Sequence, residues 1–366
     1  MPNHKIAEVL YRLNIGIVID NELLEEVFKL ILTHPNVKSR DVQLGAFLTG
    51  LMVSGLTVEA VTTLIRTALN IDGLTRFKLS IPKGERLVTV AGSGKKGLKT
   101  FNISTPACIV AVAAGAYVAK PGSGATASVS GSMDFANVIG MKTLSHQDMS
   151  EVLLKTGFGL FSIEHLIPKF DGVYGGKIFG PTPLSFGLPA IVNPIVCDSL
   201  LYGLSHPNIE LSMDVLKELG YEHVMVVSSS NDEIHYIDEL TPLPLNLIGK
   251  IEDGVISTVE SHSFSDFSNF TNCAHIDLIP GESLLENVQI AINVLDGKGP
   301  SSRESAVALN AGAILVLARK AVNIREGYEH SIDIMRSGKA MQKLEEFIDA
   351  TGGSKKALNS LRRGVS

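Results

Sequence analysis

The chain has 366 residues, of which 45% are hydrophobic and 19% are charged, so its composition is that of a globular protein and not of a disordered or fibrous one. This length allows one large domain or two ordinary domains with a sizeable core. A formal net charge of −6 without a basic cluster argues against a nucleic-acid partner held by charge. The longest apolar runs, 109–119 and 311–318, are shorter than the roughly 20 residues that cross a bilayer, so we expect no membrane partner.

The cysteines and the N-terminal residues bear on where in the cell the protein is expected. Cys108, Cys197 and Cys273 are far apart and show no metal-ligand spacing, which favours ordinary free thiols in a reducing setting. The N-terminal stretch MPNHKIAEVLYRLN has no apolar core of the signal-peptide kind. Together these features predict a cytoplasmic protein.

Residues 5–70 have helical periodicity throughout. Asp20 is placed to cap one helix, Ser39 to begin another that ends at Gly55, and Thr57 to cap a third over 58–69. No strand interrupts them, so we expect a small bundle. Its apolar residues exceed what one buried face needs, and such surplus surface commonly packs against a second copy. The bundle therefore predicts a homodimer.

Beyond residue 73 the pattern changes. Short apolar or β-branched runs at 87–90, 117–120, 224–227 and 245–248 predict strands, and helical stretches separate them. This alternation is typical of an α/β fold with a mostly parallel sheet. We therefore predict a small N-terminal helical bundle domain followed by a larger α/β domain with a mostly parallel central sheet.

The remaining segments are expected to be largely helical. Residues 145–195 are helical at first and then rich in glycine and proline, which suits a hinge or an active-site loop. Helices are predicted at 196–204 and 212–219, and again at 306–318, 324–337 and 340–349. Ser301 and Glu304 fit a capping box for the first helix of this last group. Residues 250–280 are polar and weakly periodic, and no function follows from their sequence.

Two glycine-rich turns stand out between residues 87 and 140. The strand predicted at 87–90 runs into Gly-Ser-Gly-Lys-Lys-Gly, and a helix start follows at Ser104-Thr105-Pro106. The strand at 117–120 runs into Gly122-Ser123-Gly124, with a second helix start at 130–132. A single such turn is more often only a tight turn. Two in tandem, both with serine and lysine, predict a site for two phosphate groups, because a helix start offers free N–H groups and a positive dipole end.

With these motifs the chain resembles the anthranilate phosphoribosyltransferase family over nearly its whole length. RDVQLGAFLTGLMVSGLTVEAV is similar to that family's helical domain, TFNIST to its phosphate motif and SVSGSMDFANVIG to its next helix start. Asp238-Glu239, followed by Leu-Thr-Pro, matches its metal-binding pair. The stretch GPSSRESAVALNAGAILVLARKAVNIREGYEHSIDIMRSGKA resembles its C-terminal helices.

The resemblance implies the fold of the class II nucleoside phosphorylases, in which hinge segments join a helical dimerisation domain to an α/β domain. Residues 1–72, completed by part of 145–198, would form the first domain, and 73–144 with 199–366 the second. The implied ligands are phosphoribosyl diphosphate, Mg²⁺ and a nitrogen acceptor. Chemistry agrees, because adjacent carboxylates suit Mg²⁺ and cations stabilise a departing diphosphate.

The resemblance also implies site residues. The phosphate and ribose contacts fall on Gly92, Gly94, Thr100, Asn102, Ser104, Thr105, Lys120, Ser128 and Ser132. The two glycine loops add Ser93, Lys95, Lys96, Gly122 and Ser123 as substrate-binding candidates. The metal contacts fall on Ser104, Asp238 and Glu239.

This chain departs from the family pattern at three places. The family's Gly-Thr-Gly-Gly-Asp is replaced by Gly92-Ser93-Gly94-Lys95-Lys96, and its Lys-His-Gly-Asn-Arg by Lys120-Pro121-Gly122-Ser123-Gly124. The arginine that the family uses for the anthranilate carboxylate falls near Thr182. A charge-assisted hydrogen bond contributes about 1.5–3 kcal/mol, so losing the arginine, the histidine and the asparagine together argues against anthranilate as acceptor.

Several alternatives stay open at this stage. Lys95 and Lys96 could bind an extra phosphate or be a solvated pair, and Asp232-Glu233 could compete with Asp238-Glu239 for a metal. His165, His223 and His235 are acid–base candidates, although a lone histidine is more often structural. Ser228-Ser229-Ser230 could face the ligand, and Asn310 is expected to be a satisfied core amide. The functional rivals are a relative that binds phosphate ligands without turnover, a nucleoside phosphorylase-like enzyme and a nucleic-acid-binding relative.

Overall fold

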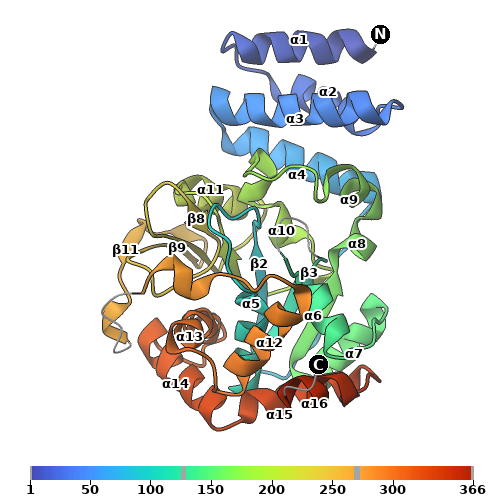
Figure 1. Cartoon of the computed structure of the whole chain (residues 1–366). Helices are drawn as coiled ribbons and strands as arrows, with labels where there is room; N and C mark the ends of the chain where they lie inside the picture. The colour runs from blue at the N-terminus through green and yellow to red at the C-terminus, as the bar shows by residue number, and fades with distance from the viewer. Residues whose placement is uncertain (1, 125–128, 268–272, 364–366) are drawn as a thin grey trace.

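The computed structural model describes residues 2–124, 129–267 and 273–363, with a stack of helices above a mixed helix and sheet unit (Figure 1). The stack consists of α1 (Pro2–Asn14), α2 (Asn21–Leu32), α3 (Val37–Ser54) and α4 (Val58–Asp72). Asp20 and Thr57 cap α2 and α4 as predicted. The prediction for α3 was wrong at its start: Asn36 is the cap and accepts the N–H of Ser39, because its side chain lies one turn earlier. Inside the bundle the Phe28 ring stacks on the Phe47 ring.

A mostly parallel sheet forms the centre of the larger unit, as predicted. Its strands follow the order β10-β9-β7-β6-β2-β3-β4, and β4, β3, β2, β6 and β7 pair in parallel. The bounds are β2 (Leu87–Gly92), β3 (Tyr117–Gly122), β4 (Phe158–Ser162), β6 (Ser199–Gly203), β7 (Val224–Ser230), β9 (Leu245–Glu252) and β10 (Val255–Ile256). β9 runs antiparallel to β7, and β8 (Tyr236–Ile237) and β11 (Glu260–His262) add short antiparallel pairs.

Two segments that the sequence assigned to helices are strands. The predicted helix at 196–204 is β5 (Ile195–Val196) followed by β6, and β4 lies within the segment that was expected to be helical. β5 pairs with β1 (Phe77–Lys78) outside the main sheet. Both β4 and β6 are buried along their whole length, so they are continuous apolar runs without the alternation that marks a half-exposed strand.

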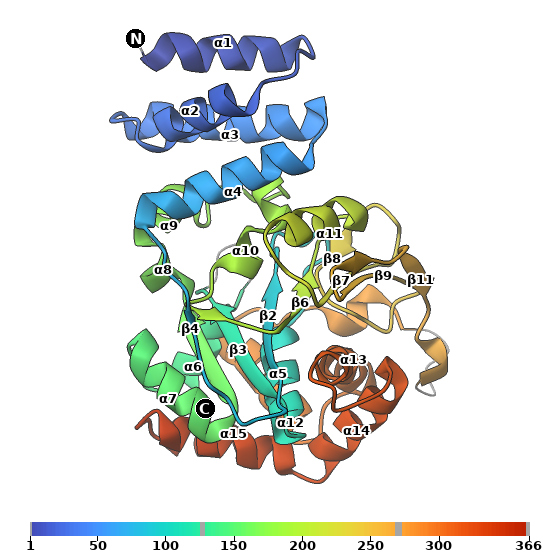
Figure 2. The ribbon, with the colours of Figure 1, turned by 180° about the vertical axis from the view of Figure 1, so that it is seen from behind.

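Helices cover both faces of the sheet (Figure 2). One layer consists of α5 (Ser104–Ala113), α6 (Ser132–Val138), α7 (His146–Thr156), α12 (Leu284–Leu295), α13 (Ser301–Leu317), α14 (Ile324–Arg336), α15 (Lys339–Ala350) and α16 (Lys356–Arg362). On the other side α10 (Leu188–Ile191) packs on β2, and α11 (Ile209–Glu218) packs on β7 and β9. The C-terminal helices agree with the predictions, but the capping box at Ser301 is absent, because Pro300 is the N-cap residue.

The glycine- and proline-rich segment connects the two units. α9 (Pro168–Tyr174) and the 3₁₀ turn η1 (Pro183–Phe186) pack against α4, and α8 (Ile163–Leu166) packs against α9. Figure 2 shows α9 at one end of α4 with α8 below it. The Asp72 carboxylate at the end of α4 accepts the backbone N–H groups of Lys169 and Phe170 at 2.8 and 2.9 Å. Among the described helices, none has the length and apolar character that a bilayer crossing requires.

Candidate functional site

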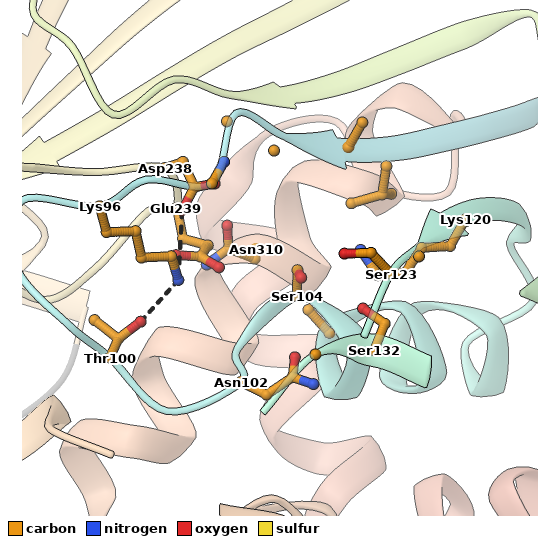
Figure 3. A pocket seen from close by; sticks show the side chains of 18 of the residues that line it. Lys96, Thr100, Asn102, Ser104, Lys120, Ser123, Ser132, Asp238, Glu239 and Asn310 are labelled. Atoms are coloured by element: carbon orange, nitrogen blue, oxygen red, sulfur yellow. Dashed lines mark hydrogen bonds and ion pairs between the residues drawn. The ribbon is translucent and has the colours of Figure 1, made fainter. Parts of the chain in front are cut away.

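A cavity of about 180 Å³ lies at the carboxyl ends of the parallel strands, and α5 and α13 close it from one side (Figure 3). Because β2 and β3 are parallel neighbours, their glycine-rich turns meet at the same sheet edge. Most of the predicted site residues line this cavity: Gly92, Gly94, Lys95, Lys96, Thr100, Asn102, Ser104, Lys120, Gly122, Ser123, Ser132, Asp238 and Glu239. Residues as far apart in the sequence as Gly94 and Asp238, which are 144 positions apart, thus share one hollow.

Two predicted ligand-binding residues have a different place. The Ser93 hydroxyl pairs with the Ser205 hydroxyl at 2.9 Å, and Ser93 is absent from the cavity wall. The Thr105 hydroxyl donates to the Ser132 hydroxyl at 3.0 Å, so Thr105 joins the two helix starts and does not line the cavity. Both side chains are buried behind the wall, where they support it. Ser128 lies outside the described residues.

Two glycines let Asp238 approach the sheet edge. A Cβ on Gly92 would lie 2.4 Å from Asp238 Oδ2, and a Cβ on Gly203 would lie 1.7 Å from the Asp238 carbonyl oxygen. Neither approach is possible with a side chain. The sequence predicted the role of Gly92 from its loop, whereas Gly203 ends a strand that the sequence assigned to a helix.

Lys96 binds both acidic residues of the predicted metal pair. Its Nζ lies 2.6 Å from Glu239 Oε2 and 3.4 Å from Asp238 Oδ1, and it donates to the Thr100 hydroxyl at 2.8 Å (Figure 3). The second oxygen of Asp238 accepts the Gly94 N–H at 2.8 Å. All three side chains of the ion-paired cluster are nearly enclosed, so Lys96 is not part of a solvated lysine pair.

Burial and charge act together on this cluster. Burial opposes the positive charge of Lys96, but Glu239 and Asp238 outweigh it, so the pKa of Lys96 lies above the ordinary lysine value. Burial raises the pKa of Glu239 to about 7, against the pull of Lys96 and with the added repulsion of Asp238. The ammonium is therefore charged at neutral pH. Its positive charge offsets the cost of burying the negative charge of the two acidic side chains.

Lys95 makes a different set of contacts. It has a left-handed backbone conformation, with φ at 58°, where a family glycine was expected from the resemblance. Its Nζ donates to the Ile178 carbonyl at 2.8 Å and lies 4.4 Å from the centre of the Tyr174 ring. Burial lowers the pKa of Lys95 to about 8. Lys95 thus ties the first glycine loop to the segment that follows α9.

The second loop carries a cation without such a partner. Lys120 is 4% exposed, and within the described ranges it makes no ion pair with a carboxylate. Asn102 at the start of α5 is also unsatisfied: its Oδ1 accepts the Thr105 N–H, while its enclosed Nδ2 has no partner among the described residues. Glu164 lies beside this loop, where it accepts the Gly124 N–H and the Ser162 hydroxyl, both at 2.7 Å. An anion placed here would find a buried ammonium and free donors.

Asp238 and Glu239 do not fit a divalent cation as they stand. An ammonium already occupies the space between them, and Asp238 Oδ2 is held by backbone. Within the described residues, no group of three or more His, Cys, Asp or Glu side chains has the arrangement of a metal site. Of the three residues predicted to hold a metal, Ser104 alone keeps a side chain on the cavity wall without an ion pair.

The other candidates fall outside the cavity wall. Asp232 accepts the N–H groups of Ile234 and His235 and pairs with the His235 ring at 2.7 Å, so it forms a turn and not a rival metal site. His165, His223 and His235 are absent from the lining residues. Ser229 and Ser230 bind the backbone of Glu239 and His235, so they hold the acidic loop in place.

One lining residue was predicted only as a core amide. Asn310 on α13 accepts the Leu240 N–H at 3.1 Å and donates to the Leu240 and Ala306 carbonyls at 2.7 and 2.8 Å. The core prediction is confirmed, and the amide also fixes the backbone directly after Glu239. The sequence signal was a polar residue inside an apolar helix, but nothing near it in the sequence points to residue 240.

Comparisons with known proteins give a consistent result. Residues 84–341 match the model of the glycosyl transferase family, a/b domain. The anthranilate phosphoribosyltransferase of Polynucleobacter necessarius subsp. necessarius (strain STIR1) is 33% identical over 309 residues, which cover 82% of this chain and 88% of the relative. The Acetivibrio thermocellus enzyme of the same name is 30% identical over 320 residues, with 86% and 88% covered.

Solved structures share the fold. Anthranilate phosphoribosyltransferase from Thermus thermophilus has a TM-score of 0.74 at 22% identity and covers 94% of this chain and 99% of its own. The Saccharomyces cerevisiae enzyme, solved in complex with PRPP (phosphoribosyl diphosphate) and Mg, has a TM-score of 0.73 at 20% identity, with 95% and 98% covered. At these identities the likeness concerns the fold, including the bundle and the mostly parallel sheet.

Proposed function

The chain belongs to the anthranilate phosphoribosyltransferase family of glycosyl transferases, and from that premise we propose that it transfers ribose 5-phosphate from phosphoribosyl diphosphate to a nitrogen acceptor other than anthranilate. The observation that carries this proposal is the meeting of two glycine-rich turns in one cavity, where a buried lysine has no ion pair among the described residues. A small anion-binding hollow at the carboxyl ends of parallel strands suits a sugar phosphate.

In the proposed reaction the bond between C1 of the ribose and the diphosphate oxygen breaks, and a bond from the acceptor nitrogen to C1 forms. The acceptor loses a proton, and the electron pair of the broken bond leaves with the diphosphate. We propose that Lys120, which lines the cavity, stabilises the negative charge that develops on the leaving group. Asn102, Ser123 and Ser132 supply donors that orient its oxygens.

Mg²⁺ belongs to the proposal as an ion that accompanies the donor, because the solved yeast relative contains PRPP and Mg together. Mg²⁺ in such sites is bound largely through the substrate's phosphates and keeps several waters. This mode does not require Asp238 and Glu239, which Lys96 engages. Ser104 remains the residue of this chain that we propose to contact the ion.

The acceptor half of the proposal rests on residues in and near the cavity, of which Pro121 and Ser123 line it. By the resemblance, the positions that would contact anthranilate hold Pro121 and Ser123 in the second loop and Thr182 near η1 in this chain. The Thr182 hydroxyl pairs with the Tyr174 hydroxyl at 2.7 Å and offers no positive charge. Lys95 contacts the same Tyr174 ring, but its ammonium is taken by a carbonyl. On this basis we propose a neutral nitrogen acceptor in place of an aromatic carboxylate.

The experiment is release of diphosphate from phosphoribosyl diphosphate and Mg²⁺ with a panel of aromatic amines, nitrogen heterocycles and phosphorylated acceptors. We expect release with a member of the panel and none with anthranilate. The sharpest variant is Asn102→Asp, which keeps the acceptor for the Thr105 N–H but replaces the free donor by a negative oxygen. It should lower turnover at least about tenfold, the loss expected for one charge-assisted hydrogen bond, whereas Asn137→Asp on the exposed side of α6 should not.

Two assay results would contradict the proposed transfer reaction. No release with any acceptor, together with calorimetric binding of the donor, would replace this proposal by a relative that binds phosphate ligands without turnover. That second candidate is favoured by one observation: Lys96 already fills part of a cavity whose 180 Å³ is below the roughly 300–1,000 Å³ usual for ligand sites. Phosphate-dependent cleavage of a nucleoside would instead point to a phosphorylase.

We also propose that the N-terminal helices form a homodimer in the cytoplasm. Four apolar residues on or beside them are strongly exposed: Tyr11 at 64%, Val18 at 86%, Val42 at 66% and Val53 at 84%. Free cysteines, of which Cys108 and Cys197 are buried, suit a reducing compartment. Light scattering at micromolar concentration tests the dimer, and a monomer there would contradict it.

A further inference from the structure

The ammonium of Lys96 is surrounded by oxygen atoms of the protein, two in ion pairs and one in a hydrogen bond. An ammonium has three N–H groups, and Nζ has three oxygen neighbours: Glu239 Oε2 at 2.6 Å, Thr100 Oγ1 at 2.8 Å and Asp238 Oδ1 at 3.4 Å. The Lys96 side chain is 16% exposed, and those of Asp238 and Glu239 are 6% and 7% exposed. This cation is therefore built into the wall and does not await a ligand.

The carboxylates cannot easily turn away to admit another cation. Asp238 Oδ2 is held by the Gly94 N–H, and Gly92 leaves only enough space for that oxygen. Behind Glu239, the Asn310 amide clamps both backbone groups of Leu240. The position between the two carboxylates is thus fixed by β2, by α13 and by the first glycine loop.

We propose that Lys96 takes the place of a divalent cation at Asp238 and Glu239, so that this chain has no metal site there and binds its ligand without one at that pair. The ammonium supplies one fixed positive charge where a metal would supply two charges and exchangeable waters. A ligand would meet a permanent counter-ion at this end of the cavity. The inference concerns the carboxylate pair itself and stands apart from the proposed transfer reaction.

The test is binding of Mn²⁺ to the intact protein without donor, monitored by electron paramagnetic resonance. For the unmodified protein we expect the Mn²⁺ titration to be unchanged when Asp238→Asn and Glu239→Gln are introduced together. Lys96→Met removes the ammonium and leaves two enclosed carboxylates, so it should gain one Mn²⁺ site at least about tenfold tighter than any in the unmodified protein. Adding the two carboxylate substitutions to Lys96→Met should abolish the new site.

Lys95→Met is the matched control, because this neighbouring lysine binds a carbonyl and an aromatic ring and no carboxylate among the described residues. It should gain no Mn²⁺ site. Melting with and without Mg²⁺ gives a second readout: Lys96→Met should be stabilised by the ion and the unmodified protein should not. If Lys96→Met does not fold, Lys96→Gln keeps a donor for Thr100 and takes its place.

Two results would overturn the inference. One is a Mn²⁺ site in the unmodified protein that disappears with Asp238→Asn and Glu239→Gln, because the pair would then bind metal beside Lys96. The other is a folded Lys96 variant without a new site. Neither result depends on diphosphate release, so the failure of the proposed reaction and the failure of this inference are distinguishable.

Discussion

The two glycine-rich loops of the cavity have the same plan and opposite electrostatics. Each follows a parallel strand and leads toward a helix, and the two lie side by side at one sheet edge. In the first loop Lys96 is neutralised by Asp238 and Glu239. In the second, Lys120 is buried without an ion pair among the described residues. The charge of the first loop is balanced by carboxylates of the protein. The charge of the second loop is available to an anion from outside.

The difference indicates how a shared fold can change its ligand requirements. A cation that is fixed by covalent attachment does not exchange, whereas a metal enters with its ligand. A lysine that is fixed beside two carboxylates therefore alters which charges a ligand must bring with it. The second loop, with its buried lysine, keeps the demand for a negative group. The two loops thus share one place in the fold and differ in the charge that they present to a ligand.

The largest expected effect comes from a substitution in β6 that displaces the acidic loop carrying Asp238. Gly203→Ala would place a Cβ 1.7 Å from the Asp238 carbonyl oxygen, so β6 and the acidic loop cannot keep their positions. We expect a loss of about 3 kcal/mol in the free energy of unfolding, measured with urea. Gly45→Ala is the control, because nothing lies within 4 Å of its Cβ in α3, and it should be neutral or slightly stabilising. Equal stability of both variants would show that the acidic loop moves freely.

The second expected effect tests the open loop. Lys120→Met keeps the length of the side chain and removes its charge. Affinity for inorganic diphosphate, measured by calorimetry, should fall about 10- to 100-fold, as expected for one charge-assisted hydrogen bond. The variant should be at least as stable as the parent, because a buried charge without a partner costs free energy. Lys339→Met on the exposed side of α15 is the control, and equal affinity of the two variants would remove Lys120 from the anion site.

The smallest expected effect concerns Lys95 and pH. Its pKa is lowered by burial from 10.5 to about 8, so between about pH 8 and 10 the unfolded chain holds more protons at this residue than the folded one. Stability from this group therefore rises with pH through that window, and it is lower when Lys95 is charged at more acidic pH. The melting temperature of the parent relative to Lys95→Met should rise from about pH 8 to about pH 9.5. A flat difference would place Lys95 in solvent.

Features set by neighbouring residues were predicted from the sequence more successfully than features set by distant ones. The caps at Asp20 and Thr57 depend on residues a few positions apart, and these predictions are confirmed. The hydroxyl cap expected at Ser104-Thr105 is absent, because α5 begins after Ile103 without a side-chain cap. β4 and β6 were predicted as helix because short apolar runs give no period that separates the two. Ser93 and Thr105 were assigned to the ligand because they sit in the motifs, although their hydroxyls point to Ser205 and Ser132.

The sequence alone determined the class of fold, through the alternation of strands and helices, and the two glycine-rich turns, through contiguous residues. The place of the acidic pair beside those turns followed from the family resemblance. Only the tertiary structure decided the partner of each charge. Lys96 and Glu239 are separated by 143 positions, and no local sequence pattern predicts that they form an ion pair. Side-chain pairing depends on which strands become neighbours, and that is settled by packing the whole sheet.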